Sequence, residues 1–210
     1  MNQLNSIEVN SLTQLKHLRL LQLNDNRITN IEIASFSDLS TLNKLDLDRN
    51  NLASLPDLTG VTELQILSVQ ENQLKTVPAN AFNDNVKLKF LDLSINQINK
   101  IGWAGVADLN KLVTLNITGN AIQNLPEQLG ANLESLQADQ NSFVCDCGLI
   151  KFKEWTEKSS KPELSDYVFC EQPSQYQGQA LSGLTTDQLQ QECTVKENQI
   201  ITESEKKLKT

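Results

Sequence analysis

The sequence has few of the residues, and none of the short motifs, on which catalysis usually depends. His17 is the single histidine, and in "LKHLRLL" we expect it to face solvent. No G-x-S-x-G, no H-E-x-x-H and no phosphate-binding glycine loop occurs. The carboxylates Asp46, Asp48 and Asp92 are expected to be solvated, with nothing nearby that would suit one of them to acid–base catalysis. The sequence therefore predicts a protein that is not an enzyme and needs no cofactor or metal.

Long basic runs and long apolar runs are also missing. The formal net charge is −8, and no basic run exceeds the one in the terminal "EKKLKT". A surface that follows phosphates needs clustered Lys and Arg, so we expect no nucleic acid among the partners. No stretch approaches the roughly 18–20 apolar residues of a membrane span, so we expect no membrane contact in this part of the protein.

The sequence does contain a repeat. The stretch "LNKLDLDRNNL", residues 42–52, recurs five times in one register, with asparagines spaced 24, 22, 24, 24 and 21 residues apart. A period of this length is typical of a solenoid. The repeated asparagines are Asn26, Asn50, Asn72, Asn96, Asn120 and Asn141.

The chemistry of one repeat explains the pattern. Leu45 and Leu47 point to one face of a short strand, and Asp46 points to the other. Stacked copies would form a parallel sheet with a continuous core that no single repeat can bury. Asn50 is expected at the corner after the strand, where its amide can bond unpaired backbone groups, and Asp48 is expected to face water. A second row of core residues is expected from the returning halves: Phe36, Leu58, Phe82, Val106 and Leu129.

The motif L-x-x-L-x-L-x-x-N-x-L, over residues 2 to about 143, resembles that of the leucine-rich repeat family. The resemblance implies an α/β solenoid with a parallel β-sheet on its concave face, and loops and short 3-10 turns on its convex face. The first repeat is partial, and about six more follow within residues 1–143. Because "MNQLNSIEVN" lacks the features of a signal peptide and begins at a repeat asparagine, we expect a fragment of a longer protein with an added Met1.

After Asn141 the period ends and four cysteines follow. Four cysteines allow three pairings, and C-x-C with two distant single cysteines fits a zinc site poorly. The segment is similar to the cysteine-rich C-terminal cap of extracellular leucine-rich repeat proteins, which implies the disulfides Cys145–Cys170 and Cys147–Cys193. The resemblance places the cap at 144–194, with 195–210 as a polar tail or linker, and places the parent protein in the secretory pathway. Phe152 and Trp155 of the "FKEW" helix are expected to cover the open end of the core.

The outward strand positions predict where a ligand would bind. They form columns across the repeats, and the first column contains large apolar side chains beside a mainly acidic strip. An apolar anchor ringed by polar groups is typical of binding hot spots, although Ile66 and Phe90 would also be explained by packing sideways on each other. Trp103, on the convex return, is interpreted as a groove filler rather than a contact. The predicted ligand-binding residues are Leu20, Asp46, Asp48, Ile66, Phe90 and Asp92.

A sequon, Asn116-Ile117-Thr118, lies within this same face. If Asn116 is glycosylated, its glycan would stand on the concave face and confine a ligand to the earlier strands.

The family resemblance suggests recognition as the function. Extracellular relatives with such repeats and cap include Toll-like receptors, variable lymphocyte receptors of jawless vertebrates, and adhesion and guidance proteins. The leading hypothesis is an innate-immune ectodomain that binds a protein or microbial ligand, with a soluble insect-type immune protein as a variant. The alternative is a cell-adhesion, matrix or neuronal-guidance protein. Homodimers and heterodimers are both compatible with the sequence, which does not identify the ligand.

Overall fold

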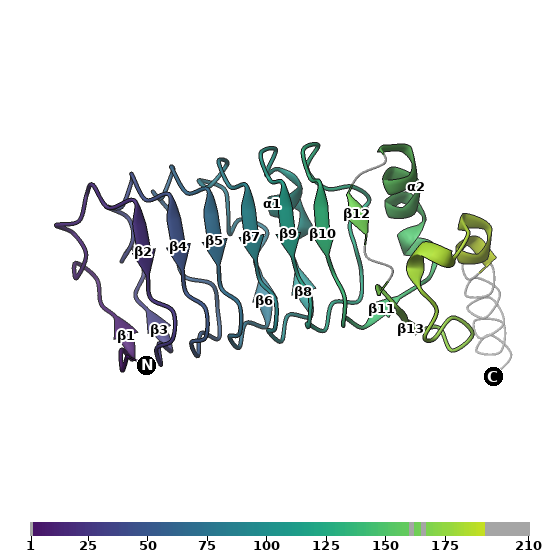
Figure 1. The fold of residues 1–210 in the computed structure, drawn as a ribbon, viewed down its shortest axis with the longest axis horizontal. Coiled ribbons are helices and arrows are strands. Elements are labelled where there is room, and N and C mark those ends of the chain that lie inside the picture. Colours follow the sequence, from purple (N-terminus) through teal and green to yellow (C-terminus); the bar gives the residue numbers. More distant parts are fainter. Residues whose placement is uncertain (1, 160–161, 165–166, 192–210) are drawn as a thin grey trace, which may run out of the picture.

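The repeats stack side by side into a solenoid whose main sheet has seven parallel strands (Figure 1). The computed structural model describes residues 2–159, 162–164 and 167–191. Each repeat adds one short strand in register with its neighbour, as the repeat pattern predicts. From the N-terminal end the strands are β2 (Leu20–Gln22), β4 (Lys44–Asp46), β5 (Ile66–Ser68), β7 (Phe90–Asp92), β9 (Thr114–Asn116), β10 (Ser135–Gln137) and β12 (Glu163–Leu164).

The returning halves of the repeats contain short parallel pairs and turns. The pairs are β1 (Ser6–Ile7) with β3 (Asn30–Ile31), and β6 (Thr76–Val77) with β8 (Lys100–Ile101). The turns are closed by i→i+3 backbone bonds of the 3-10 type, such as Leu39 N to Phe36 O at 2.9 Å. These bonds let a short segment reverse direction without leaving its backbone groups unpaired.

The core lies between the sheet and the returns. The inward strand residues Leu45 and Leu47 are fully buried, whereas Leu21 of the first strand is partly buried. His17 is exposed, as expected. The second row of core residues is also buried at all five predicted positions, Phe36, Leu58, Phe82, Val106 and Leu129.

The repeated asparagines form a ladder of hydrogen bonds at the corner after each strand. Asn50 Nδ2 donates to Leu47 O of its own repeat and to Leu23 O of the preceding one, at 3.0 and 2.9 Å. Asn50 Oδ1 accepts from Ile28 N at 2.9 Å. The same three kinds of bond recur at Asn72 and Asn96. Each corner asparagine therefore binds its own repeat to the one before it.

A five-residue helix, α1 (Trp103–Ala107), occupies the return of one repeat. The close approach of this helix to the preceding repeat requires glycine, because a Cβ on Gly105 would lie 2.1 Å from Ala79 O. Trp103 is partly buried against the core. Its place agrees with the predicted groove filler.

The C-terminal cap closes the far end of the core. It contains η1 (Cys147–Leu149), α2 (Ile150–Ser159) and η2 (Leu181–Gly183), and its strand β13 (Cys170–Gln172) pairs with β11 (Phe143–Val144). Phe152 is 1% exposed, and its ring centroid lies 5.7 Å from that of the partly buried Trp155. The helix therefore covers the core end, as the resemblance implies.

One of the two implied disulfides lies within the described residues. Cys145 and Cys170 are bonded, with Cα atoms 5.6 Å apart. Cys147 is also disulfide-bonded, but Cys193 lies outside the described residues, as does the polar tail 195–210. In the part of the chain that the structure describes, no helix has both the length and the hydrophobicity needed to cross a membrane.

Candidate ligand-binding face

The outward residues of the sheet align in the columns that the repeat register predicts. The strand pairing places Ile66 beside Lys44 on one side and Phe90 on the other, and Asp46 beside Ser68. Backbone bonds beyond the strands extend the alignment to the third column, since Arg49 N donates to Gln70 O at 2.9 Å. The first column reads Leu20, Lys44, Ile66, Phe90, Thr114, Ser135; the second Gln22, Asp46, Ser68, Asp92, Asn116, Gln137; the third Asn24, Asp48, Gln70, Ser94, Thr118, Asp139.

The apolar side chains of the first column retain contact with solvent. Leu20 is 48% exposed, and Ile66 and Phe90 are half-buried neighbours in register. The register sets these two residues next to each other, and both keep partial exposure. Lys44 separates Leu20 from Ile66, so the apolar surface is interrupted by a cation.

Asp92 is not the solvated carboxylate that the sequence predicts. It is 8% exposed, because Ser94 and Asn116 surround it. Its Oδ1 accepts from Ser94 N and Ser94 Oγ at 2.9 and 2.6 Å, and its Oδ2 accepts from Asn116 Nδ2 at 3.1 Å. Both oxygens are thus engaged within the protein, so the expectation that Asp92 lies in water is wrong.

Asp46 and Asp48 are half-buried rather than fully solvated. Asp48 Oδ1 accepts from Ser68 Oγ at 2.6 Å and from Gln70 N at 2.8 Å, and Asp46 Oδ1 accepts from Asp48 N at 3.2 Å. Burial is the main reason that the pKa of Asp48 is raised. The bonds from Ser68 and Gln70 lower this pKa, and the nearby carboxylates of Asp46 and Asp92 raise it. The three predicted carboxylates are therefore brought close enough to interact.

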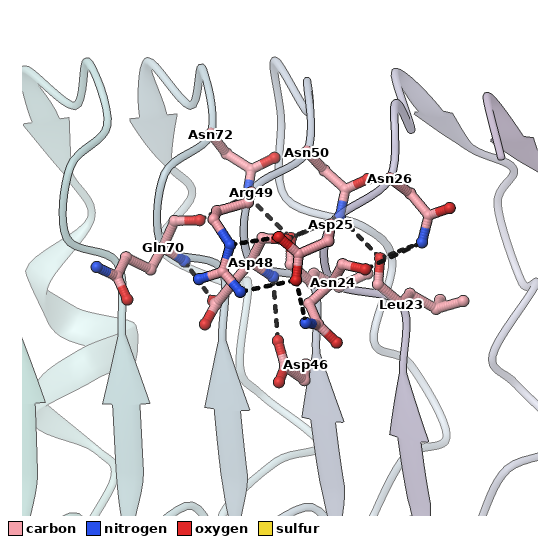
Figure 2. A network of polar contacts seen from close by, with 11 residues as sticks. Leu23, Asn24, Asp25, Asn26, Asp46, Asp48, Arg49, Asn50, Gln70 and Asn72 are labelled. Atoms are coloured by element: carbon pink, nitrogen blue, oxygen red, sulfur yellow. Dashed lines mark hydrogen bonds and ion pairs between the residues drawn. The ribbon is translucent and has the colours of Figure 1, made fainter. Parts of the chain in front are cut away.

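A salt bridge stands beside these carboxylates at the corner of the first repeats (Figure 2). Arg49 Nε and Nη2 donate to the two oxygens of Asp25 at 2.6 and 2.8 Å. The hydrogen bond from Arg49 is the main reason that the pKa of Asp25 falls to about 2. The pair is exposed, so it contributes little to stability, but it shows that this side of the face can hold a guanidinium.

The Asn116 side chain faces outward from β9, as predicted, but it is not free. Besides the bond to Asp92, its Oδ1 accepts from Thr118 N at 3.1 Å. Asn116 and the backbone of Thr118 therefore belong to the polar network that runs between β7 and β9.

The structure adds residues that the strand pattern did not predict. A hollow of about 690 Å³ opens beside the N-terminal ends of β2, β4 and β5. Leu20, Lys44 and Ile66 come from the strand columns, but the rest of its lining comes from the positions just before the strands. Reading those positions as columns would have found them: Arg19, Thr41, Asn43 and Glu63.

The described residues contain no group of three or more His, Cys, Asp or Glu side chains arranged to hold a metal ion. Asp46 and Asp48 instead bond backbone N–H groups, and Asp48 also bonds a hydroxyl.

The parallel stack of short strands, the asparagine ladder and the covered end define a solenoid repeat protein with an open sheet face. The family model described as leucine rich repeat matches residues 1–52 and 62–122, more than half of the chain. The chain belongs to the leucine-rich repeat family, whose members are typically protein-binding modules.

Two curated relatives match a shorter part of the chain. The "SLIT and NTRK-like protein 6" of Mus musculus is 33% identical over 78 residues, which is 35% of this chain and 9% of that protein. Its counterpart in Homo sapiens is 31% identical over 83 residues, 37% of this chain and 10% of that protein. The match therefore covers about a tenth of the length of these relatives.

A solved structure supports the fold. The crystal structure of the APL1 leucine-rich repeat domain superposes with a TM-score of 0.64 at 24% identity, covering 68% of this chain and 38% of that one. At this level of identity the likeness concerns the fold alone.

Proposed function

We propose that this chain is an extracellular recognition module that binds a protein or microbial ligand on its concave face, in innate immunity, and that it has no enzymatic activity. The observation that carries the proposal is the first column of the sheet, where Leu20, Ile66 and Phe90 present apolar surface next to hydrogen-bonded carboxylates. Aromatic and aliphatic anchors within a polar rim are typical of binding hot spots.

An extracellular location is supported by the cap. The Cys145–Cys170 disulfide forms and persists in oxidising compartments, whereas the cytosol keeps most thiols reduced. The likeness to the two SLIT and NTRK-like proteins is compatible with a place at the cell surface.

A second candidate function is cell adhesion or neuronal guidance. The observation that favours it is the identity of 31–33% to the SLIT and NTRK-like proteins over part of the repeats. Both candidates use the same face for binding, so the kind of surface that is recognised distinguishes them.

The test is to express the chain as a secreted fusion and measure its capture on a panel of bacteria and fungi and on animal cells. Phe90→Ala should weaken capture by about 30-fold, because a buried aromatic anchor contributes about 2 kcal/mol or more. Ile33→Ala is the matched control, since Ile33 is 80% exposed and lies outside the main sheet. Capture on microbes supports the immune function, and capture on animal cells alone supports adhesion. If Phe90→Ala and Ile33→Ala behave alike, the concave face is not the site.

We also propose that Asn116 carries a glycan in the parent protein. Attachment leaves one N–H on Nδ2, so the bond to Asp92 Oδ2 can remain. The glycan would cover the C-terminal end of β9, where Asn116 lies, and leave β2 to β7 and the positions before β9 for the ligand. Mass spectrometry of chain from a secretory host, before and after removal of N-glycans, tests this site; an unmodified Asn116 would contradict it.

A further inference from the structure

The two edges of the concave face carry opposite charge. The leading edge is defined as the first strand column together with the positions one and three residues before each strand. The trailing edge is defined as the second and third columns together with the residue before each corner asparagine. The alignment before the strands is set by backbone bonds, such as Asn43 N to Arg19 O at 2.8 Å and Val113 N to Lys89 O at 2.8 Å.

The two edges differ strongly in charge, and the leading edge is basic although the whole chain has a net charge of −8. The trailing edge has six acidic side chains and one basic side chain, which are Asp25, Asp46, Asp48, Glu71, Asp92, Asp139 and Arg49. The leading edge reverses this balance with five basic and two acidic side chains, which are Arg19, Lys44, Lys87, Lys89, Lys111, Glu63 and Glu134.

Most of the leading-edge cations have no ionic partner within the described residues. Lys87 is bound to Glu63 at 2.5 Å. No salt bridge within those residues involves the other four, Arg19, Lys44, Lys89 and Lys111. Of these four, all but the half-buried Lys44 are exposed. They therefore remain able to bind an external anion.

The four cations line two hollows of similar chemistry. The first, of about 690 Å³, sets Arg19 and Lys44 beside Leu20 and Ile66. The second, of about 340 Å³, sets Lys89 and Lys111 beside Val113. Each hollow thus combines two cations and one carboxylate, Glu63 in the first and Glu134 in the second, with aliphatic surface. Such a combination suits a carboxylate that is carried next to an aliphatic group.

We propose that the leading edge binds an acidic, aliphatic segment of a partner protein, with carboxylates of the segment in both hollows. This inference rests on the proposed function in that the segment belongs to the ligand of the concave face. The acidic trailing edge repels the same segment, so it confines the segment to the leading edge and fixes its position across the sheet.

The observations favour a peptide over a sulfated polysaccharide. An anionic polysaccharide is held mainly by an uninterrupted row of cations, but here a carboxylate interrupts the row in each hollow, Glu63 in the first and Glu134 in the second. A sulfate group would not bury the aliphatic lining of the hollows, whereas leucine or valine side chains of a peptide would bury that lining.

The test uses the 210-residue chain and three fluorescein-labelled peptides, each of four Gly-Leu-X units with X as Glu, Gln or Lys. Fluorescence anisotropy should show that the Glu peptide binds at least about tenfold more tightly than the Gln peptide, and less tightly as salt is raised. Lys44→Glu and Lys89→Glu should each weaken its binding by about tenfold. Lys75→Glu, an exposed change of equal charge just before β6, should change it less than about twofold. Amide shifts should move at Asn43, Ile66 and Val113.

Several results would overturn the inference. Equal binding of the Glu and Gln peptides would remove the role of charge, and equal loss in Lys75→Glu would show that only net charge matters. Binding of a heparin decasaccharide through Lys44 and Lys89, without binding of the Glu peptide, would make the edge a polysaccharide site. If capture depends on Phe90 but the Glu peptide does not bind, the proposed function is retained and this inference is rejected. If the Glu peptide binds as described but capture does not depend on Phe90, this inference is retained and the proposed function is rejected.

Discussion

The two ends of the solenoid leave their core in different states. Near the N-terminal end, Leu4 and Val9 are 45% and 46% exposed. At the other end, Phe143, Leu149 and Phe152 are at most 1% exposed, because the cap packs against the end of the core and contributes Leu149 and Phe152 to it. A repeat stacked on both sides is complete, whereas a repeat with one neighbour depends on what covers its free side. The stability of a repeat in this chain therefore depends on its neighbours rather than on the repeat alone.

The largest effect is expected from opening the covered end. Phe152→Ala should lower the free energy of unfolding of the cap by about 3–5 kcal/mol, because it removes a buried aromatic side chain and leaves a cavity. Leu4→Ala, at the other end, should cost less than about 0.5 kcal/mol because the side chain is already half exposed. Amide exchange within α2 and β1, together with urea denaturation, measures both. Similar losses in the two variants would mean that the ends do not differ as described.

A smaller difference is expected along the asparagine ladder. Leu52 N and Leu47 O each form a hydrogen bond of 3.0 Å with the side-chain amide of Asn72. Asn72→Ala leaves both buried groups without this partner and should lower the free energy of unfolding by about 3 kcal/mol. Asn26 accepts a bond from Leu4 N, but its amide donates to no carbonyl of the preceding repeat. Asn26→Ala should therefore lower the free energy of unfolding by only about 1 kcal/mol. Urea denaturation of the two variants provides the comparison. A larger loss at Asn26 would contradict the dependence on neighbours.

The smallest effect concerns two carboxylates one repeat apart. The pKa of Asp25 is lowered, so its contribution to stability is present above the unfolded value of about 3.9 and is lost as pH falls toward about 2. The pKa of Asp48 is raised, so its charge opposes folding once the pH exceeds its folded pKa. Asp48→Asn should therefore stabilise the protein at pH 7 by about 0.5 kcal/mol, and the gain should vanish at pH 3.

Asp25→Asn is the matched control; it should destabilise at pH 7, and this loss should shrink as the pH falls toward 2. Thermal unfolding of both variants between pH 2 and pH 7 distinguishes the two signs. Stabilisation by both substitutions would show that the net charge of the chain, rather than the separate surroundings of the two carboxylates, sets the response.

The repeat architecture could be predicted because its signal is periodic. The alternation of Leu45, Asp46 and Leu47 determines which side chains enter the core, and the equal spacing of the asparagines determines which of them stack. The columns of the concave face follow from the same register, so the neighbours Ile66 and Phe90 were found without the structure.

Other features of the site depend on contacts between repeats that no single period reveals. Asp92 is buried because Ser94 bonds it from the same repeat and Asn116 from the next, and the sequence pattern treats all outward positions alike. The leading-edge hollow includes Arg19 and Asn43, which precede the strands and were not assigned a face. Of the cap, the pairing that involves Cys193 lies beyond the described residues.

The asparagine ladder has a direction. Ile28 N receives its acceptor from Asn50, one repeat later in the chain, and Ile98 N likewise receives its acceptor from Asn120. During synthesis from the N-terminus, the backbone N–H groups after each corner therefore gain this acceptor only when the next repeat has left the ribosome. The last such corner, at Asn141, is followed directly by β11, which pairs with β13 of the cap. Whole repeats can thus be gained or lost in evolution without disturbing the ladder, whereas the order of synthesis leaves the closing step to the cap.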